Sequence, residues 1–357
     1  MLLADHTTLG VGGPADRAIT ATTPDELADA VLEAEAAGEP WLVLGGGSNV
    51  LVADEGFAGT VVLVASRGIE RLPDAPGSTR PVRLRVQAGE PWDSLVAHTV
   101  EQGWAGIEAL SGIPGSTGAA PIQNIGAYGQ EIVESLIAVE VLDLDRGERR
   151  TVPAPDLHLG YRTSAIKQGW RAVVLSVDLA LEHDSAGLSR PVAYGQLADA
   201  LGVAIGDRAP LVGVRAATLQ LRASKGMVLD AADPQSRSAG SFFTNPIVSE
   251  SFARGLPVDA PRWPQQPEPR PVAVPLGQEP AAPPPVSEGT VKLSAAWLIE
   301  HAGIARGFRL PGSGASVSSK HTLALTNASG QATAAEVAQL ARYIQTRVLS
   351  EFGVLLH

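Results

Sequence analysis

The sequence contains no cysteine. This absence excludes disulfide bonds, thiolate metal sites and a cysteine nucleophile, and it fits a reducing cytosol. No apolar run approaches the roughly 18 to 20 residues that a membrane-spanning helix needs. Residues 1–10 (MLLADHTTLG) lack a basic region followed by a long apolar stretch, so they do not form a secretory signal. We therefore expect a cytoplasmic protein without a membrane partner.

Positive charge is scarce. Lys and Arg number 27 against 38 Asp and Glu, which gives a net charge of −11. A nucleic-acid-binding surface needs clustered Lys and Arg, so we expect no nucleic-acid partner. The densest basic run, RGERR (146–150), lies between two strand-like runs and is interpreted as a solvated hairpin tip. The 7 histidines are scattered without metal-binding spacing, so no metal site is predicted.

The length of 357 residues predicts two or three domains. A helix is predicted from the capping box formed by Thr23 and Glu26, with Leu27, Val31 and Ala34 as its apolar stripe and Gly38 at its end. A buried strand, WLVL, follows and runs into a triple glycine. Further predicted elements are a strand at 60–65, a strand in VRLRVQAG, a helix at about 91–102, strands in AVEVLDL and AVVLSVDLAL, a helix in VKLSAAWLIEHAG, and a last helix that starts at the capping box of Thr333 and Glu336.

Glycine is plentiful, with 38 residues, and it gathers into a few tight clusters between strands. Without a β-carbon, a glycine loop can bring its backbone amides against phosphates. LGGGSNVLV (44–52) is either such a loop or a plain turn, whereas SGIPGSTGAAPIQNIGAYG (111–129) favours ligand binding. GVGGPA (10–15) matches a dinucleotide-binding pattern, but no strand precedes it and no helix follows, so we reject that interpretation.

Three further sites carry polar side chains of interest. LGYRTSAIK (159–167) contains Arg162, whose guanidinium either is a surface charge or stabilises a developing enolate or carboxylate. SAGSFFTNP (238–246) contains Ser241, which is either a turn residue or a proton donor held in a dry pocket. No G-x-S-x-G pattern occurs, so Ser241 is not a hydrolase nucleophile. His301 lies on a predicted helix, where we expect a satisfied, core-facing histidine.

Taken together, the motifs resemble the UDP-N-acetylenolpyruvoylglucosamine reductase (MurB) family of bacterial peptidoglycan synthesis, in the subtype with a tyrosine substrate loop. The matching pieces cover nearly the whole chain and stand in the order TTLGVGGPA, LGGGSNVLV, GIPGSTGAAPIQNIGAYG, YRTS, AYGQL, SAGSFFTNP, KLSAAWLIEHAG and SSKHTLALTN.

The resemblance implies an α/β (α+β) fold. An FAD-binding domain of the vanillyl-alcohol-oxidase (PCMH) type would be followed by a smaller C-terminal α/β substrate domain. We expect an FAD-binding region at 1–225 with lobes at roughly 1–65 and 66–225, and a substrate domain at 226–345. Residues 257–289 form a proline-rich insertion in that domain, and 346–357 form a C-terminal segment that looks truncated against the family pattern.

The family uses NADPH to reduce non-covalently bound FAD. Hydride then passes to the enolpyruvyl double bond of UDP-N-acetyl-3-O-(1-carboxyvinyl)glucosamine, which yields UDP-N-acetylmuramate. By resemblance, Arg162 steadies the enolate and Ser241 donates the proton, in a site that Phe242 and Phe243 help to keep free of water. The third catalytic residue of the family, a glutamate, is expected two positions beyond His357.

The resemblance also assigns binding residues. Those expected to hold FAD are Gly45, Gly46, Gly47, Ser48, Asn49, Ser111, Gly112, Pro114, Gly115, Ser116, Thr117 and Gly118. Those expected to contact the UDP-sugar are Gln123, Asn124, Tyr161, Tyr194, Lys225 and Asn245, with Gln123, Asn124 and Ala127 also near the flavin.

Two alternatives stay open at this point. One is a flavin oxidase of the same fold, although many such oxidases attach FAD through histidine or cysteine and the sugar-nucleotide motifs would be unexplained. The other is a catalytically impaired protein that binds FAD or the sugar nucleotide and lacks the glutamate. We expect a monomer with no obligate protein partner.

Overall fold

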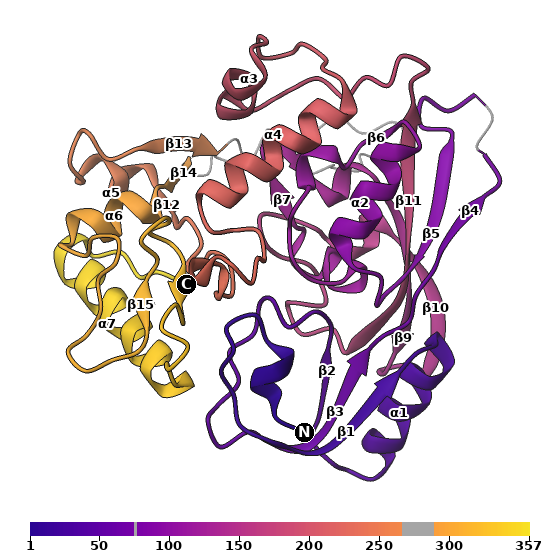
Figure 1. Ribbon diagram of the computed structural model, residues 1–357, viewed down its shortest axis with the longest axis horizontal. Helices are drawn as coiled ribbons and strands as arrows, with labels where there is room; N and C mark the ends of the chain where they lie inside the picture. Colours follow the sequence, from indigo (N-terminus) through magenta and orange to yellow (C-terminus); the bar gives the residue numbers. More distant parts are fainter. Residues whose placement is uncertain (75–76, 266–288) are drawn as a thin grey trace, which may run out of the picture.

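The computed structural model describes residues 1–74, 77–265 and 289–357. Most of the predicted proline-rich insertion, residues 266–288, lies outside the described residues. The N-terminal part of the chain, up to α4, and the C-terminal part form two bodies that lie side by side, with residues 225–245 running between them (Figure 1).

The smaller N-terminal sheet is parallel and three-stranded. It consists of β1 (Ala15–Ala21), β3 (Phe57–Val64) and β2 (Trp41–Leu44), with β3 in the centre. Because β1 directly follows GVGGPA, no helix opens there, which confirms the rejection of the dinucleotide pattern. Helix α1 (Pro24–Ala36) connects β1 to β2.

Helix α1 begins as the sequence predicts, with one difference. The hydroxyl of Thr23 accepts a hydrogen bond from the amide of Glu26 at 3.1 Å, but the Glu26 carboxylate accepts from the amide and hydroxyl of Thr22. Its stripe of Leu27, Val31 and Ala34 is buried as expected. These side chains fill the space between the parallel sheet and the larger sheet, where they meet apolar residues of β9 and β11.

The larger sheet is antiparallel, and its strands lie in the order β10, β9, β11, β5, β4. Their bounds are β4 (Ile69–Leu72), β5 (Val82–Gln87), β9 (Leu136–Asp143), β10 (Glu148–Pro153) and β11 (Ala172–His183). Strands β9 and β10 form a hairpin in which Asp143 pairs with Glu148. The RGERR run lies at the tip of this hairpin and along β10, as predicted. The short strand β6 (Trp104–Ala105) pairs with the end of β11.

Helices cover the other face and one end of this sheet (Figure 1). Helix α2 (Trp92–Glu101) buries Trp92 and Leu95 in the largest apolar core. Helices α3 (Gly195–Leu201) and α4 (Leu211–Ser224) share a smaller core with Tyr128 at its edge. Between α2 and β9 runs the long glycine loop, which contains the short strands β7 (Gly126–Ala127) and β8 (Gln130–Glu131).

The C-terminal body has its own antiparallel sheet, in the order β12 (Ile247–Ser249), β14 (Thr290–Leu293), β13 (Arg262–Gln265). Around it pack α5 (Glu250–Arg254), α6 (Ala295–His301), the pair β15 (Ser316–Val317) and β16 (Leu325–Thr326), and α7 (Ala334–Phe352).

One predicted helix is shorter than expected. The stretch VKLSAAWLIEHAG was predicted to be helical, but its first residues belong to β14, where Lys292 pairs with Ile247 on one side and Trp263 on the other. The helix starts after Ser294, whose hydroxyl caps the amide of Trp297. Strand pairing from both sides therefore overrides the helical period. The capping box of Thr333 and Glu336 at the start of α7 is confirmed.

The N-terminal segment joins the two bodies. Leu9 and Val11 are buried in the core of the C-terminal body, although they precede β1. The Thr8 hydroxyl donates to the carbonyl of Ser238 at 2.6 Å, and the Asn327 amide donates to the carbonyl of Leu9 at 3.1 Å. Asp54, between β2 and β3, accepts hydrogen bonds from the first two amides of α7. The helices and sheets of the two bodies together confirm the mixed α/β architecture that the sequence predicts.

Candidate active site

The two predicted glycine loops touch each other. A β-carbon on Gly46 would lie 2.7 Å from the Cα of Gly115, and one on Gly45 would overlap the hydroxyl of Ser116. Gly47 has φ +61° and leaves no room for a β-carbon beside the carbonyl of His6. The loops are also bonded to each other, because Ser48 Oγ donates to the carbonyl of Pro114 at 3.0 Å and Asn49 donates to Gln123 at 3.1 Å. The structure therefore brings these predicted residues together, and only glycine fits the contact.

Backbone amides of these loops are left without acceptors. Within the described residues, no acceptor takes the amides of residues 46–49, nor those of Ile113, Gly115 and Ser116. By contrast, the amides of Thr117 and Gly118 donate to the backbone of residues 88–90. A concentration of unpaired N–H groups in a glycine turn attracts anionic oxygens, phosphate above all. The loops therefore form a cradle that can hold a pyrophosphate.

The beginning of the second loop is anchored by a carboxylate. Asp93, in the first turn of α2, accepts from the amide of Gly112 at 2.6 Å and forms a two-pronged ion pair with Arg215 of α4 at 2.7 and 2.8 Å. Burial would raise the pKa of the Asp93 carboxyl, but the hydrogen bonds from Arg215 and Gly112 lower it below its ordinary value. The carboxylate thus stays charged and holds the loop against α4.

Arg162 occupies a strained position. Its φ is +55°, a left-handed value that side chains other than glycine rarely adopt. Its guanidinium donates to the carbonyls of Asn124 at 3.0 Å and Gly126 at 2.6 Å. A guanidinium has five N–H donors, so three are left for a ligand. Glycine at position 126 leaves room for this guanidinium. A β-carbon there would lie only 3.2 Å from Nη1 of Arg162.

Asn124 is also in the left-handed region, with φ +44°. Its side chain donates to Glu131 at 2.8 Å and to the carbonyl of Gly160 at 3.1 Å, and it accepts from the amide of Val133. These bonds fix the backbone whose carbonyl orients Arg162. Tyr161 lies under two cations, the guanidinium of Arg162 at 5.8 Å and the ammonium of Lys292 at 4.8 Å from its ring centre.

Tyr194 and Lys225 meet over Tyr128. The rings of Tyr194 and Tyr128 pack edge to face at 5.6 Å, and the Lys225 ammonium lies 5.4 Å from the centre of the Tyr128 ring. Lys225 also donates to Gln196 at 2.7 Å. Burial and the charge of Arg222 lower the pKa of Lys225. The structure thus brings two predicted substrate residues into one cluster, the residue before α3 and the residue after α4.

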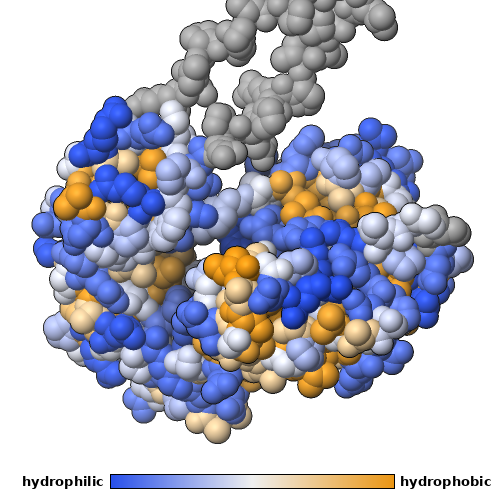
Figure 2. Space-filling view, turned by 90° about the horizontal axis from the view of Figure 1, so that it is seen from above, coloured by the Kyte–Doolittle hydropathy of each residue, from blue (hydrophilic) through white to orange (hydrophobic). Residues whose placement is uncertain are grey.

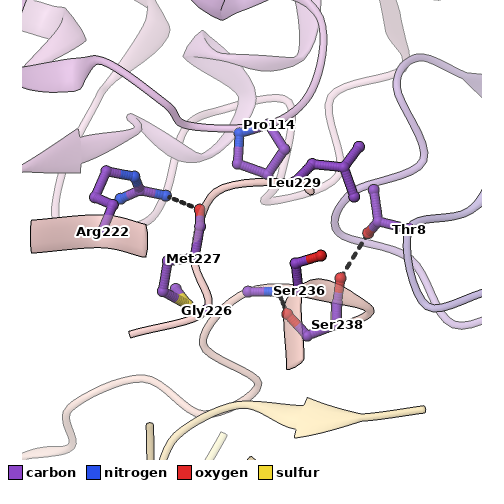
Figure 3. Close-up of a pocket in the computed structure, with 9 residues that line it drawn as sticks. Thr8, Pro114, Arg222, Gly226, Met227, Leu229, Ser236 and Ser238 are labelled. Atoms are coloured by element: carbon purple, nitrogen blue, oxygen red, sulfur yellow. Dashed lines mark hydrogen bonds between the residues drawn. The ribbon is translucent and has the colours of Figure 1, made fainter. Parts of the chain in front are cut away.

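Arg222 belongs to the same cluster, and the sequence interpretation missed it. Its side chain is 8% exposed and donates to the carbonyl of Met227 at 2.8 Å, while its Nε has no acceptor within the described residues (Figure 3). Burial lowers the pKa of Arg222 to about 10, although Tyr128 and Asp93 oppose this effect. Its spacing from Lys225 in RASKG was the available signal, because i and i+3 share a helix face.

Arg222 lines a small cavity between the two bodies. The other walls come from the second glycine loop, the segment after α4 and the N-terminal segment (Figure 3). The lining residues are Thr8, Pro114, Arg222, Gly226, Met227, Leu229, Ser236, Ser238 and Gly240. A space-filling view from above shows a hollow between the bodies (Figure 2). Cations that are partly or wholly buried near this junction make it suited to an anionic ligand.

Ser241 is exposed, contrary to the expectation of a dry pocket. Its two phenylalanine neighbours do not enclose it, because Phe243 is buried in the core of the C-terminal body and Phe242 packs on that core. The segment is fixed by its backbone, as the amide of Phe242 donates to the carbonyl of Leu323 at 2.8 Å. Within the described residues, no hydrogen bond joins Ser241 to Arg162.

Asn245 and His301 both lie in the C-terminal body, at the two ends of the α6 region. Asn245 uses its side-chain oxygen to accept from the amide of Ala295 at 3.0 Å, so it supports the start of α6. His301 was expected to face the core, but it is exposed and stacks on Trp297 with 3.8 Å between ring centres. Its Nδ1 lies 2.9 Å from the carbonyl of Trp297, so the expected hydrogen-bond partner exists although the burial does not.

Comparisons with known proteins agree with this geometry. A family model described as UDP-N-acetylenolpyruvoylglucosamine reductase, C-terminal domain, matches residues 233–357. A model described as FAD binding domain matches residues 15–152. The expected pairing of an FAD-binding domain with a C-terminal domain is therefore confirmed.

Whole-chain relatives carry the same description. A UDP-N-acetylenolpyruvoylglucosamine reductase of Leifsonia xyli subsp. xyli is 58% identical over 366 residues, which cover 99% of this chain and 96% of the relative. One of Salinispora arenicola is 50% identical, with 99% and 92% covered. The crystal structure of UDP-N-acetylenolpyruvylglucosamine reductase (MurB) from Thermus caldophilus superposes with a TM-score of 0.63 at 27% identity, over 100% of this chain and 96% of that chain.

Proposed function

The chain belongs to the UDP-N-acetylenolpyruvoylglucosamine reductase family, and we propose how its residues perform that reaction. The enzyme is an FAD-dependent oxidoreductase that uses NADPH and acts in peptidoglycan precursor synthesis. Family membership over nearly the full length disfavours the oxidase and the impaired binding protein as readings of this chain. No helix within the described residues is long and apolar enough to cross a membrane.

The observation that carries the proposal is the contact between the two glycine loops beside a buried arginine. The unpaired amides of residues 46–49 and of Gly115 and Ser116 would hold the FAD pyrophosphate. The Gly45 and Gly46 contacts show why a β-carbon would close this cradle. The residues present therefore fit the cofactor. We propose that residues 1–225 bind it and that 226–345 provide the substrate domain. The FAD binding domain model covers residues 15–152 of the first region, and the C-terminal domain model covers 233–357.

FAD held by these loops would supply the two-electron chemistry that couples oxidation of NADPH to reduction of the enolpyruvyl double bond. Hydride on one alkene carbon leaves negative charge on the other, which spreads into the attached carboxylate. Arg162 would hold that carboxylate with its free N–H donors. Because backbone carbonyls and a left-handed backbone fix the guanidinium, little reorganisation is needed when the charge develops.

Ser241 would complete the addition. Its hydroxyl proton passes to the carbon that carries the negative charge, a C–H bond forms, and the serine oxygen recovers a proton from solvent. The exposure of Ser241 allows this recovery. A bound substrate in the hollow would exclude water during the transfer itself. Lys225, Tyr194 and Asn245 would contact the sugar nucleotide, with Lys225 opposite its diphosphate.

An anaerobic experiment tests the whole proposal. The purified holoenzyme is mixed with NADPH, and the flavin absorption is followed before and after addition of the enolpyruvyl sugar nucleotide. Bleaching followed by recovery supports both half-reactions. Bleaching without recovery contradicts the assigned substrate step, and a chain that binds no flavin contradicts the cradle.

A further inference from the structure

A short hairpin pairs Glu131 with Gly126, whose carbonyl accepts from Arg162. The two residues that join strands β7 and β8, Tyr128 and Gly129, have φ +47° and +84°. Positive φ at both central positions is the backbone of a tight hairpin turn whose twist matches the strands on either side. The turn therefore fixes the register of the pair. The proposed function gives Glu131 no role.

The Glu131 carboxylate accepts hydrogen bonds from two neighbours. The side-chain nitrogen of Asn124 donates to its Oε2 at 2.8 Å, and the backbone amide of Glu134 donates to the same side chain in a capping box. A β-carbon on Gly126 would lie 2.8 Å from Cγ of Glu131 and 3.2 Å from Nη1 of Arg162. The acidic side chain and the guanidinium therefore border the same glycine.

Glu131 sets the direction in which the Asn124 amide points. A carboxylate has acceptors only, so the nitrogen of Asn124, and not its oxygen, faces Glu131. That nitrogen also donates to the carbonyl of Gly160 at 3.1 Å, and the oxygen accepts from the amide of Val133 at 3.2 Å. Because Asn124 is 1% exposed, the loss of a partner leaves a buried polar group unpaired. These bonds hold its backbone at φ +44°, a strained left-handed value.

Arg162 depends on Asn124 in two ways. Its guanidinium donates to the Asn124 carbonyl at 3.0 Å, and the Asn124 side chain holds Gly160, which starts the tight turn that carries Arg162. In that turn the amide of Gly160 donates to the carbonyl of Thr163 at 3.2 Å, and the amide of Thr163 donates back at 3.3 Å. One side chain therefore ties the base of the turn to a carbonyl that aims its guanidinium.

We propose that Glu131 is a positioning residue for Arg162 in the reduction of the enolpyruvyl group. The inference rests on the proposed function, because it needs Arg162 to hold the substrate carboxylate. Without the Glu131 carboxylate, the Asn124 amide loses the partner that sets its direction, and its left-handed backbone relaxes. The carbonyls of residues 124 and 126 then shift, and the guanidinium moves with them. A misplacement of about 1 Å can cost about 100-fold in rate.

Stopped-flow absorbance of the FAD-loaded enzyme tests this. The flavin is bleached with NADPH and then mixed with the enolpyruvyl sugar nucleotide, so each half-reaction has its own rate. The variants are Glu131→Ala, which removes the acceptor, and Glu131→Gln, which keeps one oxygen for Asn124. The matched control is Glu134→Ala, because Glu134 accepts from the amide of Glu131 at 2.9 Å in the same capping box but does not bond Asn124.

Glu131→Ala is expected to slow flavin reoxidation by about 10- to 100-fold. Glu131→Gln is expected to slow it by about 3- to 10-fold, since a hydrogen bond to a neutral acceptor is about half as strong as one to a carboxylate. Glu134→Ala should reoxidise its flavin at close to the wild-type rate. Bleaching by NADPH should keep its rate in all three variants. Normal reoxidation in Glu131→Ala would overturn the inference, as would equal slowing of both half-reactions.

A double-mutant cycle separates positioning from general damage to the site. If Glu131 acts through Arg162, Glu131→Ala slows reoxidation by less than about twofold in an enzyme that already carries Arg162→Lys. The full loss in that background would contradict the inference. If Glu131→Ala binds no flavin, Glu131→Gln takes its place in the cycle. If Arg162→Lys alone reoxidises normally, the assigned role of Arg162 fails first, so the two failures are distinguishable.

Discussion

The backbone amide of Thr244 donates to the carbonyl oxygen of His357 at 2.7 Å, and the Thr244 hydroxyl reaches the same oxygen at 3.2 Å. His357 is therefore hydrogen-bonded to Thr244, which follows Ser241 by three positions in the sequence. The preceding residues Val354 and Leu356 are buried in the core of the C-terminal body. This segment consequently supports the backbone that presents Ser241.

Leu356→Ala is expected to destabilise the protein. Leu356 is fully buried, so its truncation removes apolar contacts and leaves a cavity, at a cost of about 2–5 kcal/mol. Leu355→Ala is the control, because Leu355 is 49% exposed and its truncation should cost little. Urea denaturation of both variants measures the difference, and equal midpoints would contradict the role of the C-terminal segment.

Gly47→Ala is expected to weaken FAD binding. The alanine must adopt φ +61° and would overlap the carbonyl of His6, which forces the first glycine loop away from Gly115. Gly38→Ala is matched to it, since Gly38 has φ +66° but nothing within 4 Å of a β-carbon. Both variants share the left-handed strain of about 1 kcal/mol. Titration of apo-protein with FAD should show a loss for Gly47→Ala alone. A similar loss in both variants would mean that strain, rather than the contact, explains the effect.

Arg162→Lys is expected to slow substrate reduction by about 100- to 1,000-fold, because a lysine cannot reproduce a fixed fork of donors. Flavin reduction by NADPH should change much less. Stopped-flow absorbance separates the two half-reactions. Arg149→Lys, at an exposed ion pair with Asp25, controls for the substitution itself. Equal slowing of both half-reactions would argue that Arg162 positions the flavin and not the substrate.

Ser241→Ala is expected to slow flavin reoxidation by the enolpyruvyl sugar nucleotide by about 100- to 10,000-fold, the usual contribution of a general acid. NADPH should still bleach the flavin at the normal rate. Ser185→Ala, at an exposed loop position, serves as control. Normal reoxidation in Ser241→Ala would remove the serine from the reaction.

Asp93→Asn is expected to lower stability by about 1–2 kcal/mol at pH 7, after allowance for partial solvent screening of a carboxylate that is 39% exposed. Because the pKa of Asp93 is lowered in the folded protein, its contribution is complete above the unfolded value of 3.8. That contribution is lost as the pH falls through the lower folded value. Thermal unfolding of both proteins should therefore differ at pH 7, and the difference should shrink as the pH falls below 3.8. A constant difference over this range would exclude the ionised carboxylate as the cause.

Local signals in the sequence were sufficient for much of the fold. Thr23 and Thr333 mark helix starts through contacts within one turn, and Leu27 and Val31 are buried as their spacing predicts. The start of α6 could not be predicted in this way, because Lys292 is held in β14 by strands that lie more than 25 residues away in sequence.

The candidate site shows the same division. Glycine clusters predict the phosphate cradle because the backbone freedom that the cradle needs is a property of the glycine residues themselves. The burial of Arg222 depends on its packing beneath the second glycine loop, more than 100 residues earlier. The exposure of Ser241 depends on Phe243 turning into a core completed by α7. Neither contact leaves a pattern in a short window of sequence.

The burial of Leu9 has a consequence for how the protein is made. Apart from Val11 and Leu51, the residues of its core lie beyond residue 238, so this N-terminal residue finds most of its packing partners only when synthesis is well advanced. The amide of Thr8 meanwhile bonds the carbonyl of Gly47 in the cofactor loop. Contacts between such distant residues form slowly. The N-terminal segment that borders the first glycine loop therefore completes its packing only after the C-terminal body has been synthesised.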